Sequence, residues 1–211
     1  MRTCDINLRD PFVLVWENRC YLYGTRGETC WGPADGFDVY VGDDLQSWGG
    51  PRECFHNDGS FWATENYWAP EVHPWRGRFV MLASFKAEGV RRCTCALIAD
   101  APEGPFRPWS DGGLTPAGWE CLDGTLVLSR QNEPYLVFCH EWVQAVDGAV
   151  CALRLTDDLR ASVGEPCVLF HASEARPWVR TVHHARTGID GFVTDGPFAL
   201  RTGKGTLLLL W

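Results

Sequence analysis

The chain has 211 residues, of which 45% are apolar, and its formal net charge at pH 7 is −8. A chain of this length can bury a substantial core, and 11 Trp and 11 Phe supply large side chains for it, which excludes a disordered protein. The acidic balance argues against a nucleic-acid partner, because phosphate binding draws on clustered Lys and Arg. We therefore expect a folded protein with a neutral ligand.

The turn residues indicate the fold class. The 22 Gly and 13 Pro separate many short apolar runs, and no long segment has the 3.6-residue period of a helix, so we predict an all-β chain. The first residues lack an apolar signal core, and no run approaches the roughly 18 apolar residues of a membrane span, so we expect a cytosolic protein. The ten Cys fall mainly in predicted strands without C-x-x-C spacing, which favours buried thiols over zinc ligands.

The first predicted hairpin covers residues 9–25 (RDPFVLVWENRCYLYGT). A carboxylate, Asp10, stands at its start, and Glu17 and Asn18 form its turn. A third strand follows at residues 36–48 (GFDVYVGDDLQSW), after a loop that contains Gly and Pro. The segment therefore has the pattern of a sheet of consecutive antiparallel strands.

The second hairpin covers residues 68–85 (WAPEVHPWRGRFVMLASF), with Glu71 near its start and a turn at Arg76 and Gly77. Tyr67 and Trp68 lead directly into Glu71. Flat rings beside a carboxylate are typical of sites that stack on sugars, although such rings also pack between sheets. A third strand begins at Cys93.

The third hairpin covers residues 122–141 (LDGTLVLSRQNEPYLVFCHE), with Asp123 just before a strand at residues 125–128 and a return strand at 135–139. His140, Glu141 and Trp142 follow, an imidazole, a carboxylate and an indole in succession. A structural role and a role in a site are equally consistent with this triplet. A third strand begins at Cys151.

The last hairpin covers residues 194–211 (TDGPFALRTGKGTLLLLW), with Asp195 at its start. Ending at Trp211 would leave the apolar second strand of this hairpin without the third strand that follows in the other copies, so we expect a fragment of a longer protein. His183 and His184 are adjacent and would diverge in an extended chain, so we assign no metal site to them. An ion bound in the central channel would leave no readable signal in the sequence, so we assign no required cofactor.

The four carboxylates recur at intervals of 61, 52 and 72 residues (71 − 10, 123 − 71 and 195 − 123). These intervals are close to the roughly 40 to 50 residues of a four-stranded propeller blade. Because the first strand of every blade lines the central channel, acids at equivalent starts would converge at one mouth. The alternative is that each Asp only accepts backbone N–H bonds in the turn before its strand.

Crowded carboxylates cannot all ionise equally, so one would stay protonated beside an ionised partner. Glycoside hydrolysis needs such a pair, an acid for the leaving oxygen and a base for water. The four acids therefore indicate a glycosidase site.

The motifs RDPF, YLYGT, GFDVYVGDDLQSW, WAPEVH, LDGT and TDGPF resemble those of glycoside hydrolase family 43, whose members are five-bladed propellers acting on arabinose- and xylose-containing polysaccharides. The resemblance implies that this chain covers about three and a half blades of a single, incomplete catalytic propeller, with blade starts near residues 9, 68, 122 and 194. It implies an inverting enzyme of the α-L-arabinofuranosidase or β-xylosidase type, with a neutral oligosaccharide or polysaccharide as substrate.

By this resemblance Asp10 would be the general base, Asp123 would orient the acid and tune its pKa, and Asp195 would be the general acid. The common family pattern has Glu where this chain has Asp195, which is one methylene shorter, so Glu71 and Glu141 are reserve candidates. The residues predicted to contact the sugar are Trp68, Tyr67, Glu71, His140, Glu141, Trp142 and Phe37.

Three alternatives remain at this point. A propeller that binds carbohydrate without catalysis would fit the Asp195 departure. A scaffold for protein partners would give no reason for acids to repeat. Another propeller sugar enzyme, such as a fructan hydrolase or a mannoside phosphorylase, fits the WAPE and TDGP motifs less well.

Overall fold

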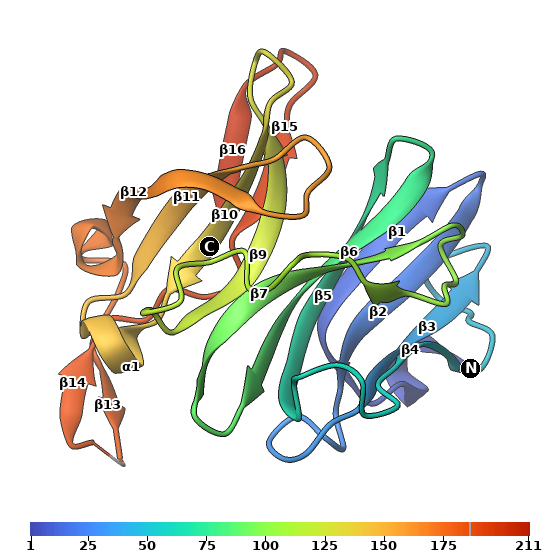
Figure 1. Ribbon diagram of the computed structural model, residues 1–211, viewed down its shortest axis with the longest axis horizontal. Coiled ribbons are helices and arrows are strands. Elements are labelled where there is room, and N and C mark those ends of the chain that lie inside the picture. Colours follow the sequence, from blue (N-terminus) through green and yellow to red (C-terminus); the bar gives the residue numbers. More distant parts are fainter. Residues whose placement is uncertain (186) are drawn as a thin grey trace. The chain divides into compact units, whose positions relative to one another are not determined.

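The computed structural model describes residues 1–185 and 187–211, and its regular secondary structure is almost entirely β-strand (Figure 1). It contains three four-stranded antiparallel sheets, each with its strands in chain order. The first sheet consists of β1 (Leu8–Trp16), β2 (Arg19–Arg26), β3 (Gly36–Gly42) and β4 (Arg52–His56). The second consists of β5 (Glu65–Trp75), β6 (Arg78–Ala87), β7 (Val90–Ala99) and β8 (Arg107–Pro108). The third consists of β9 (Cys121–Leu128), β10 (Pro134–His140), β11 (Ala149–Leu155) and β12 (Ser162–His171).

Two short hairpins complete the strands. They are β13 (Val182–His184) with β14 (Ile189–Gly191), and β15 (Phe198–Arg201) with β16 (Leu207–Leu210). The helical elements are equally short: η1 (Thr3–Asp5), α1 (Trp142–Ala145) and η2 (Ala172–Ala175). No helix among the described residues is long and apolar enough to cross a membrane. The all-β prediction is confirmed, and the repeated four-stranded sheets are those of a partial propeller.

The chain divides into two compact units. Unit 1 consists of Met1–Val90 with Cys95–Trp109, and unit 2 of Arg91–Thr94 with Ser110–Trp211. The single catalytic domain expected from the sequence remains a prediction. The first strands of the sheets begin at Leu8, Glu65 and Cys121, and β15 begins at Phe198.

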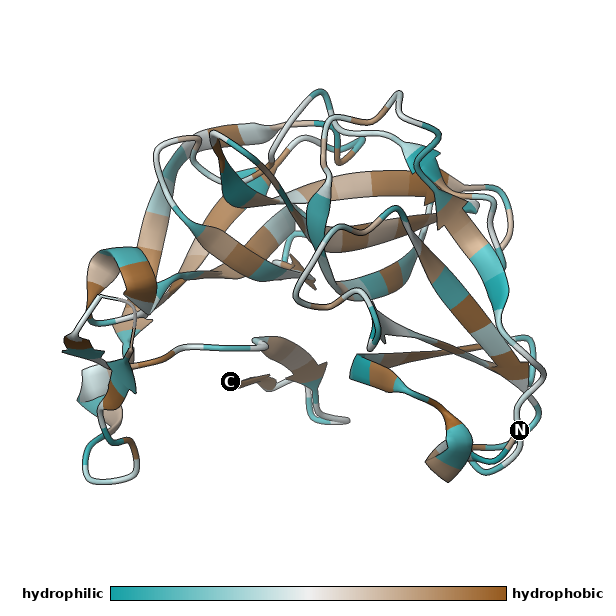
Figure 2. Cartoon of the chain, turned by 90° about the horizontal axis from the view of Figure 1, so that it is seen from below, coloured by the Kyte–Doolittle hydropathy of each residue, from teal (hydrophilic) through white to brown (hydrophobic). Residues whose placement is uncertain are grey.

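Burial differs sharply from strand to strand. The inner strand β6 is buried almost throughout its length, as a strand covered on both faces must be, whereas most of β12 is exposed. Other strands alternate apolar and polar residues, visible as brown and teal bands in Figure 2. In unit 2 the buried cluster at the centre of the sheet consists of Leu122, Val127, Val137, Cys139 and Val150.

All ten cysteines are free thiols, and seven of them are buried. Cys93, Cys95, Cys139 and Cys151 lie within strands, which confirms the prediction that these thiols fill the core. Burial raises the pKa of the Cys151 thiol to about 11, so this side chain stays protonated and unreactive at neutral pH.

Candidate active site

The first strand of each four-stranded sheet is interrupted by a bulge at the same place. In β1 the pairing with β2 shifts between Arg9 and Phe12, and Asp10 within that bulge has a φ of 50°. Asp123 has a φ of 54° where the pairing of β9 with β10 shifts. A positive φ is costly for a residue other than Gly and is concentrated at functional sites, where a bulge re-aims a side chain. Both acids therefore lie inside their strands, slightly farther along than the strand starts that the sequence predicted.

The second sheet has the same bulge without the acid. Ala69, with a φ of 45°, lies where the pairing of β5 with β6 shifts between Trp68 and Glu71. Glu71 lies two residues farther along, and its Oε2 is 3.1 Å from Nε2 of His73. This register corrects the expectation that Glu71 is equivalent to Asp10 and Asp123.

Asp10 projects an exposed carboxylate whose Oδ2 is held by a buried hydroxyl. Thr25 Oγ1 donates to Asp10 Oδ2 at 2.6 Å and accepts the backbone N–H of Ala69 at 2.9 Å. The strand β2 can approach the bulge because residue 24 is Gly, since a Cβ there would lie 2.5 Å from the Arg9 carbonyl oxygen. The local sequence thus supplies both the bulge and the group that orients its acid.

In unit 2, Asp123 is half-buried, and its Oδ2 accepts the backbone N–H of Gly196 at 3.1 Å. That bond ties the bulge of β9 to the segment that carries Asp195, which is exposed and precedes β15. Burial above all raises the pKa of the Cys139 thiol well above its ordinary value, and the negative charges of Asp123 and Asp195 act in the same direction. The two acids therefore share one neighbourhood, while their convergence with Asp10 remains a prediction.

Trp68 lies beside the Asp10 region together with a ring that sequence reasoning missed. Its Nε1 donates to the Cys30 carbonyl oxygen at 2.7 Å, which fixes the loop after β2. Trp31, in that loop, packs edge-to-face on Trp68 with ring centroids 5.4 Å apart, and it remains 76% exposed. The Arg9 guanidinium lies 5.3 Å from the Trp31 ring centroid. The sequence signal that could have identified Trp31 is its place in a long loop, between Cys30 and a Gly-Pro pair, where a large ring is expected to be exposed.

Phe37 and Tyr67 belong to the core of unit 1. Phe37 is fully buried, Tyr67 is 2% exposed, and both contact Phe55 and Phe85. The Tyr67 hydroxyl donates to the Ala63 carbonyl oxygen at 2.8 Å. Their rings are enclosed by protein, which corrects the expectation that they contact sugar.

His140, Glu141 and Trp142, which were predicted to contact the sugar, have three different environments. The His140 ring stacks on Trp119 with centroids 4.1 Å apart, and its Nε2 lies 2.9 Å from Gln144 Oε1. Trp142 is partly buried and packs edge-to-face against His184.

Glu141, at 8% exposure, forms a buried ion pair with Arg92. A carboxylate paired in this way neutralises a buried cation. The structure therefore corrects the expectation that Glu141 binds the sugar or stands in reserve as the acid.

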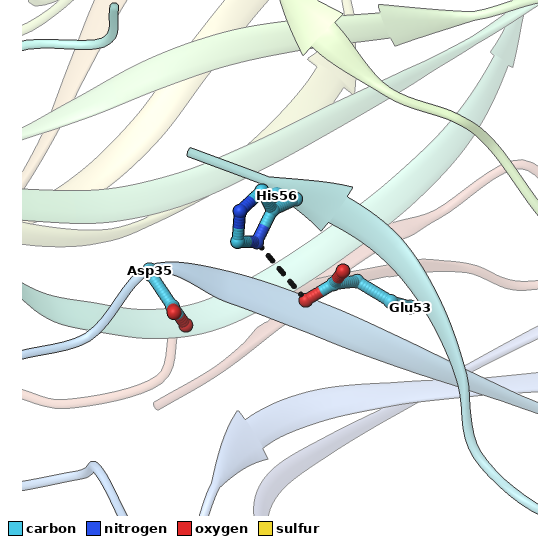
Figure 3. A group of neighbouring side chains, drawn as sticks. All are labelled: Asp35, Glu53 and His56. Carbon is cyan, nitrogen blue, oxygen red and sulfur yellow. Dashed lines mark hydrogen bonds and ion pairs between the residues drawn. The ribbon is translucent and has the colours of Figure 1, made fainter. Parts of the chain in front are cut away.

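Three side chains in unit 1 offer metal-ligand atoms close to one another, namely Asp35, Glu53 and His56 (Figure 3). The Arg26 guanidinium already donates hydrogen bonds to two of them, to Asp35 Oδ1 at 3.0 Å and to Glu53 Oε1 at 2.9 Å. It also donates to Asp38 Oδ1 at 2.6 Å. Burial opposes the charge on Arg26, yet its hydrogen bonds with Asp38 and Glu53 raise the pKa of the guanidinium above its usual value. A cation would have to displace that guanidinium, so we interpret the group as a structural ion-pair network.

Comparison with known proteins places this geometry in a family. The family described as glycosyl hydrolases family 43 matches residues 4–210. The solved structure of an endo-arabinase from Bacteroides thetaiotaomicron is 38% identical in sequence and superposes with a TM-score of 0.91. The match covers 100% of this chain and 72% of the endo-arabinase chain. An endo-1,4-β-xylanase from the same species is 23% identical over 94% of this chain and 61% of its own, with a TM-score of 0.67, which shows likeness of fold.

Among curated proteins, an extracellular exo-α-(1→5)-L-arabinofuranosidase from Cellvibrio japonicus is 21% identical over 171 residues. The match covers 74% of this chain and 45% of the relative, so the chain spans less than half the length of that protein. The expectation of a cytosolic protein is wrong by this comparison, because the matched relative is extracellular. The composition of the first residues was an insufficient guide to the compartment.

Proposed function

Because this chain belongs to glycosyl hydrolases family 43, we propose that it carries the catalytic acids of an inverting glycosidase that cleaves α-L-arabinofuranosyl linkages in arabinan. The observation that carries the proposal is the shared bulge geometry, which presents Asp10 and Asp123 from positive-φ positions in equivalent strands. The choice of arabinan over xylan is supported by the endo-arabinase, which matches the whole chain, and by the arabinofuranosidase.

In the proposed reaction Asp10 removes a proton from water, and the resulting hydroxide attacks the anomeric carbon. The bond from that carbon to the glycosidic oxygen breaks, and Asp195 donates its proton to the leaving oxygen. Asp123, which is tied to Gly196, holds the segment that carries the acid. Attack by water on the face opposite the leaving group inverts the anomeric configuration.

The sugar would lie against the rings beside Asp10. Trp68 and Trp31 form a rigid edge-to-face pair, and Trp31 keeps most of its surface open to solvent. Such rings bind a sugar through its C–H faces at a low cost in side-chain entropy. The likeness to the extracellular arabinofuranosidase supports a secreted location, in which the enzyme would encounter its polysaccharide.

A substrate panel tests this proposal. Purified chain, checked for folding by circular dichroism, is assayed on linear arabinan and xylan by reducing-sugar release. It is also assayed on the 4-nitrophenyl α-L-arabinofuranoside and β-D-xyloside. We expect turnover of arabinan without turnover of xylan. The reverse preference would refute the substrate assignment.

The short acid at position 195 suggests a second candidate function, that of a protein that binds carbohydrate without cleaving it. Folded chain that binds arabinan without turnover, both as wild type and as Asp195→Glu, would support that function. Turnover gained only in Asp195→Glu would show that the site is intact but that its acid falls short.

A further inference from the structure

Thr25 is a buried residue, 1% exposed, whose hydroxyl connects the bulges of β1 and β5. The hydroxyl carries a single proton. Because its oxygen accepts the Ala69 N–H at 2.9 Å, the proton is directed at Asp10 Oδ2, 2.6 Å away. An O···O separation of 2.6 Å is typical of a hydroxyl that donates to a carboxylate. The geometry therefore fixes one oxygen of Asp10 as an acceptor.

The other oxygen of Asp10 remains available for chemistry. Within residues 1–185 and 187–211, no N–H or O–H group donates to Asp10 Oδ1, and the side chain is exposed. With Oδ2 occupied, Oδ1 is the atom that can accept a proton from a water molecule. A base whose side chain turned freely would spend part of its time with the wrong orientation, which costs rate.

The same ladder position is occupied by a small side chain in every four-stranded sheet. Thr25 pairs with Arg9, Ser84 pairs with Trp68, and Cys139 pairs with Leu122. Each partner directly precedes the positive-φ residue of its bulge. The three sheets share this position, but its side chain differs from sheet to sheet. A small residue here is therefore a feature of the repeated fold, whereas a hydroxyl that bonds a bulge acid is specific to the first sheet.

We propose that Thr25 is a positioning residue for the reaction. It holds Asp10 by Oδ2, so that Oδ1 receives the proton of the attacking water. This inference rests on the proposed function, in which Asp10 is the base. It goes beyond that function by assigning separate tasks to the two carboxylate oxygens and a task to a residue that never touches the substrate.

The test compares Thr25→Val, which keeps the shape and removes the hydroxyl, with Thr25→Ser, which keeps the hydroxyl. On linear arabinan we expect Thr25→Val to lower kcat about 10- to 100-fold with KM within about twofold, because a hydrogen bond to a charged group is lost. Thr25→Ser should stay within about threefold of wild type in both constants, since a hydroxyl remains to donate to Asp10. If Thr25→Val fails to fold, Thr25→Cys, whose thiol is a weak donor, should give an intermediate kcat.

A double-mutant cycle separates positioning from general support of the structure. If Thr25 acts through Asp10, adding Thr25→Val to Asp10→Asn causes no further loss of kcat. Equal kcat in Thr25→Val and Thr25→Ser, or losses that add fully in the double variant, would overturn the inference. Wild-type chain without turnover would overturn the proposed function as well, whereas active wild type with an unaffected Thr25→Val would overturn this inference alone.

Discussion

The bulges of β1 and β9 place Asp10 and Asp123 at nearly the same positive φ, 50° and 54°, but hold these acids in different ways. Asp10 is exposed and receives a side-chain hydroxyl from a neighbouring strand, whereas Asp123 is half-buried and receives a backbone N–H from a distant segment. The equivalent bulge of β5 carries Ala69 and no acid. The repeat therefore supplies a backbone that can present an acid, and the surroundings of each copy decide what that acid can do.

The largest expected effect is the loss of kcat when each of the two acids is replaced by Asn. Asp10→Asn should lower kcat on arabinan by roughly 10²- to 10⁴-fold, as expected when a general base is lost. Asp123→Asn should cost less, about 10- to 100-fold, because it removes the negative charge from the acceptor of the Gly196 N–H and so weakens an orienting hydrogen bond. Steady-state kinetics measure both, with the exposed Asp43→Asn as the matched control. A larger loss in Asp123→Asn would mean that the two roles are exchanged.

Two glycines, Gly24 and Gly124, lie beside the bulges and allow neighbouring atoms to approach closely. A Cβ at Gly24 would meet the backbone oxygen of Arg9 at 2.5 Å, whereas one at Gly124 would meet side-chain atoms of Leu136 and Thr94 at 2.7 Å. We expect Gly24→Ala to lower the free energy of unfolding by about 1–3 kcal/mol and Gly124→Ala by less, because side chains can move more easily than backbone.

Urea melts measure both glycine variants. The control is Gly118→Ala, where a Cβ would meet nothing within 4 Å. Its unfolding free energy should change by no more than about 0.5 kcal/mol. Equal losses in all three variants would show that the close approaches do not matter.

The smallest expected effect concerns the ring beside Asp10. Trp31→Ala should raise KM for arabinan about threefold to tenfold with kcat nearly unchanged, because stacking on the sugar is lost. Trp178→Ala is the matched control, since this Trp is 91% exposed and has no role in the proposed sugar site. An equal rise of KM in both variants, or in neither, would remove Trp31 from the sugar site.

Much of the fold could be predicted from the sequence because turns and alternation are local. The hairpin turn at Glu17 and Asn18 and the third strands that contain Cys93 and Cys151 follow from Gly, Pro and polar residues between apolar runs. The bulges could not be predicted, because a register shift is a property of two paired strands. The same applies to the second sheet, where the bulge lies at Ala69 and not at Glu71, the residue that the sequence made equivalent to Asp10 and Asp123.

Side-chain roles were harder to predict than strands. Tyr67 and Trp68 are adjacent aromatic residues, yet the first is enclosed among Phe rings and the second packs against exposed Trp31. Glu141 has the sequence context of a site acid, but its partner Arg92 is distant in the chain. Thr25 looks like an ordinary strand residue until its two hydrogen bonds are known.

The configuration of the first product tests the central claim that Asp10 activates water for direct attack. Proton NMR would follow the earliest sugar released from linear arabinan, before the anomers equilibrate. Attack by a water molecule on an α-L-arabinofuranosyl linkage predicts that the β-anomer appears first. Initial release of the α-anomer would contradict the account, because it would require a carboxylate to act as nucleophile in place of a base.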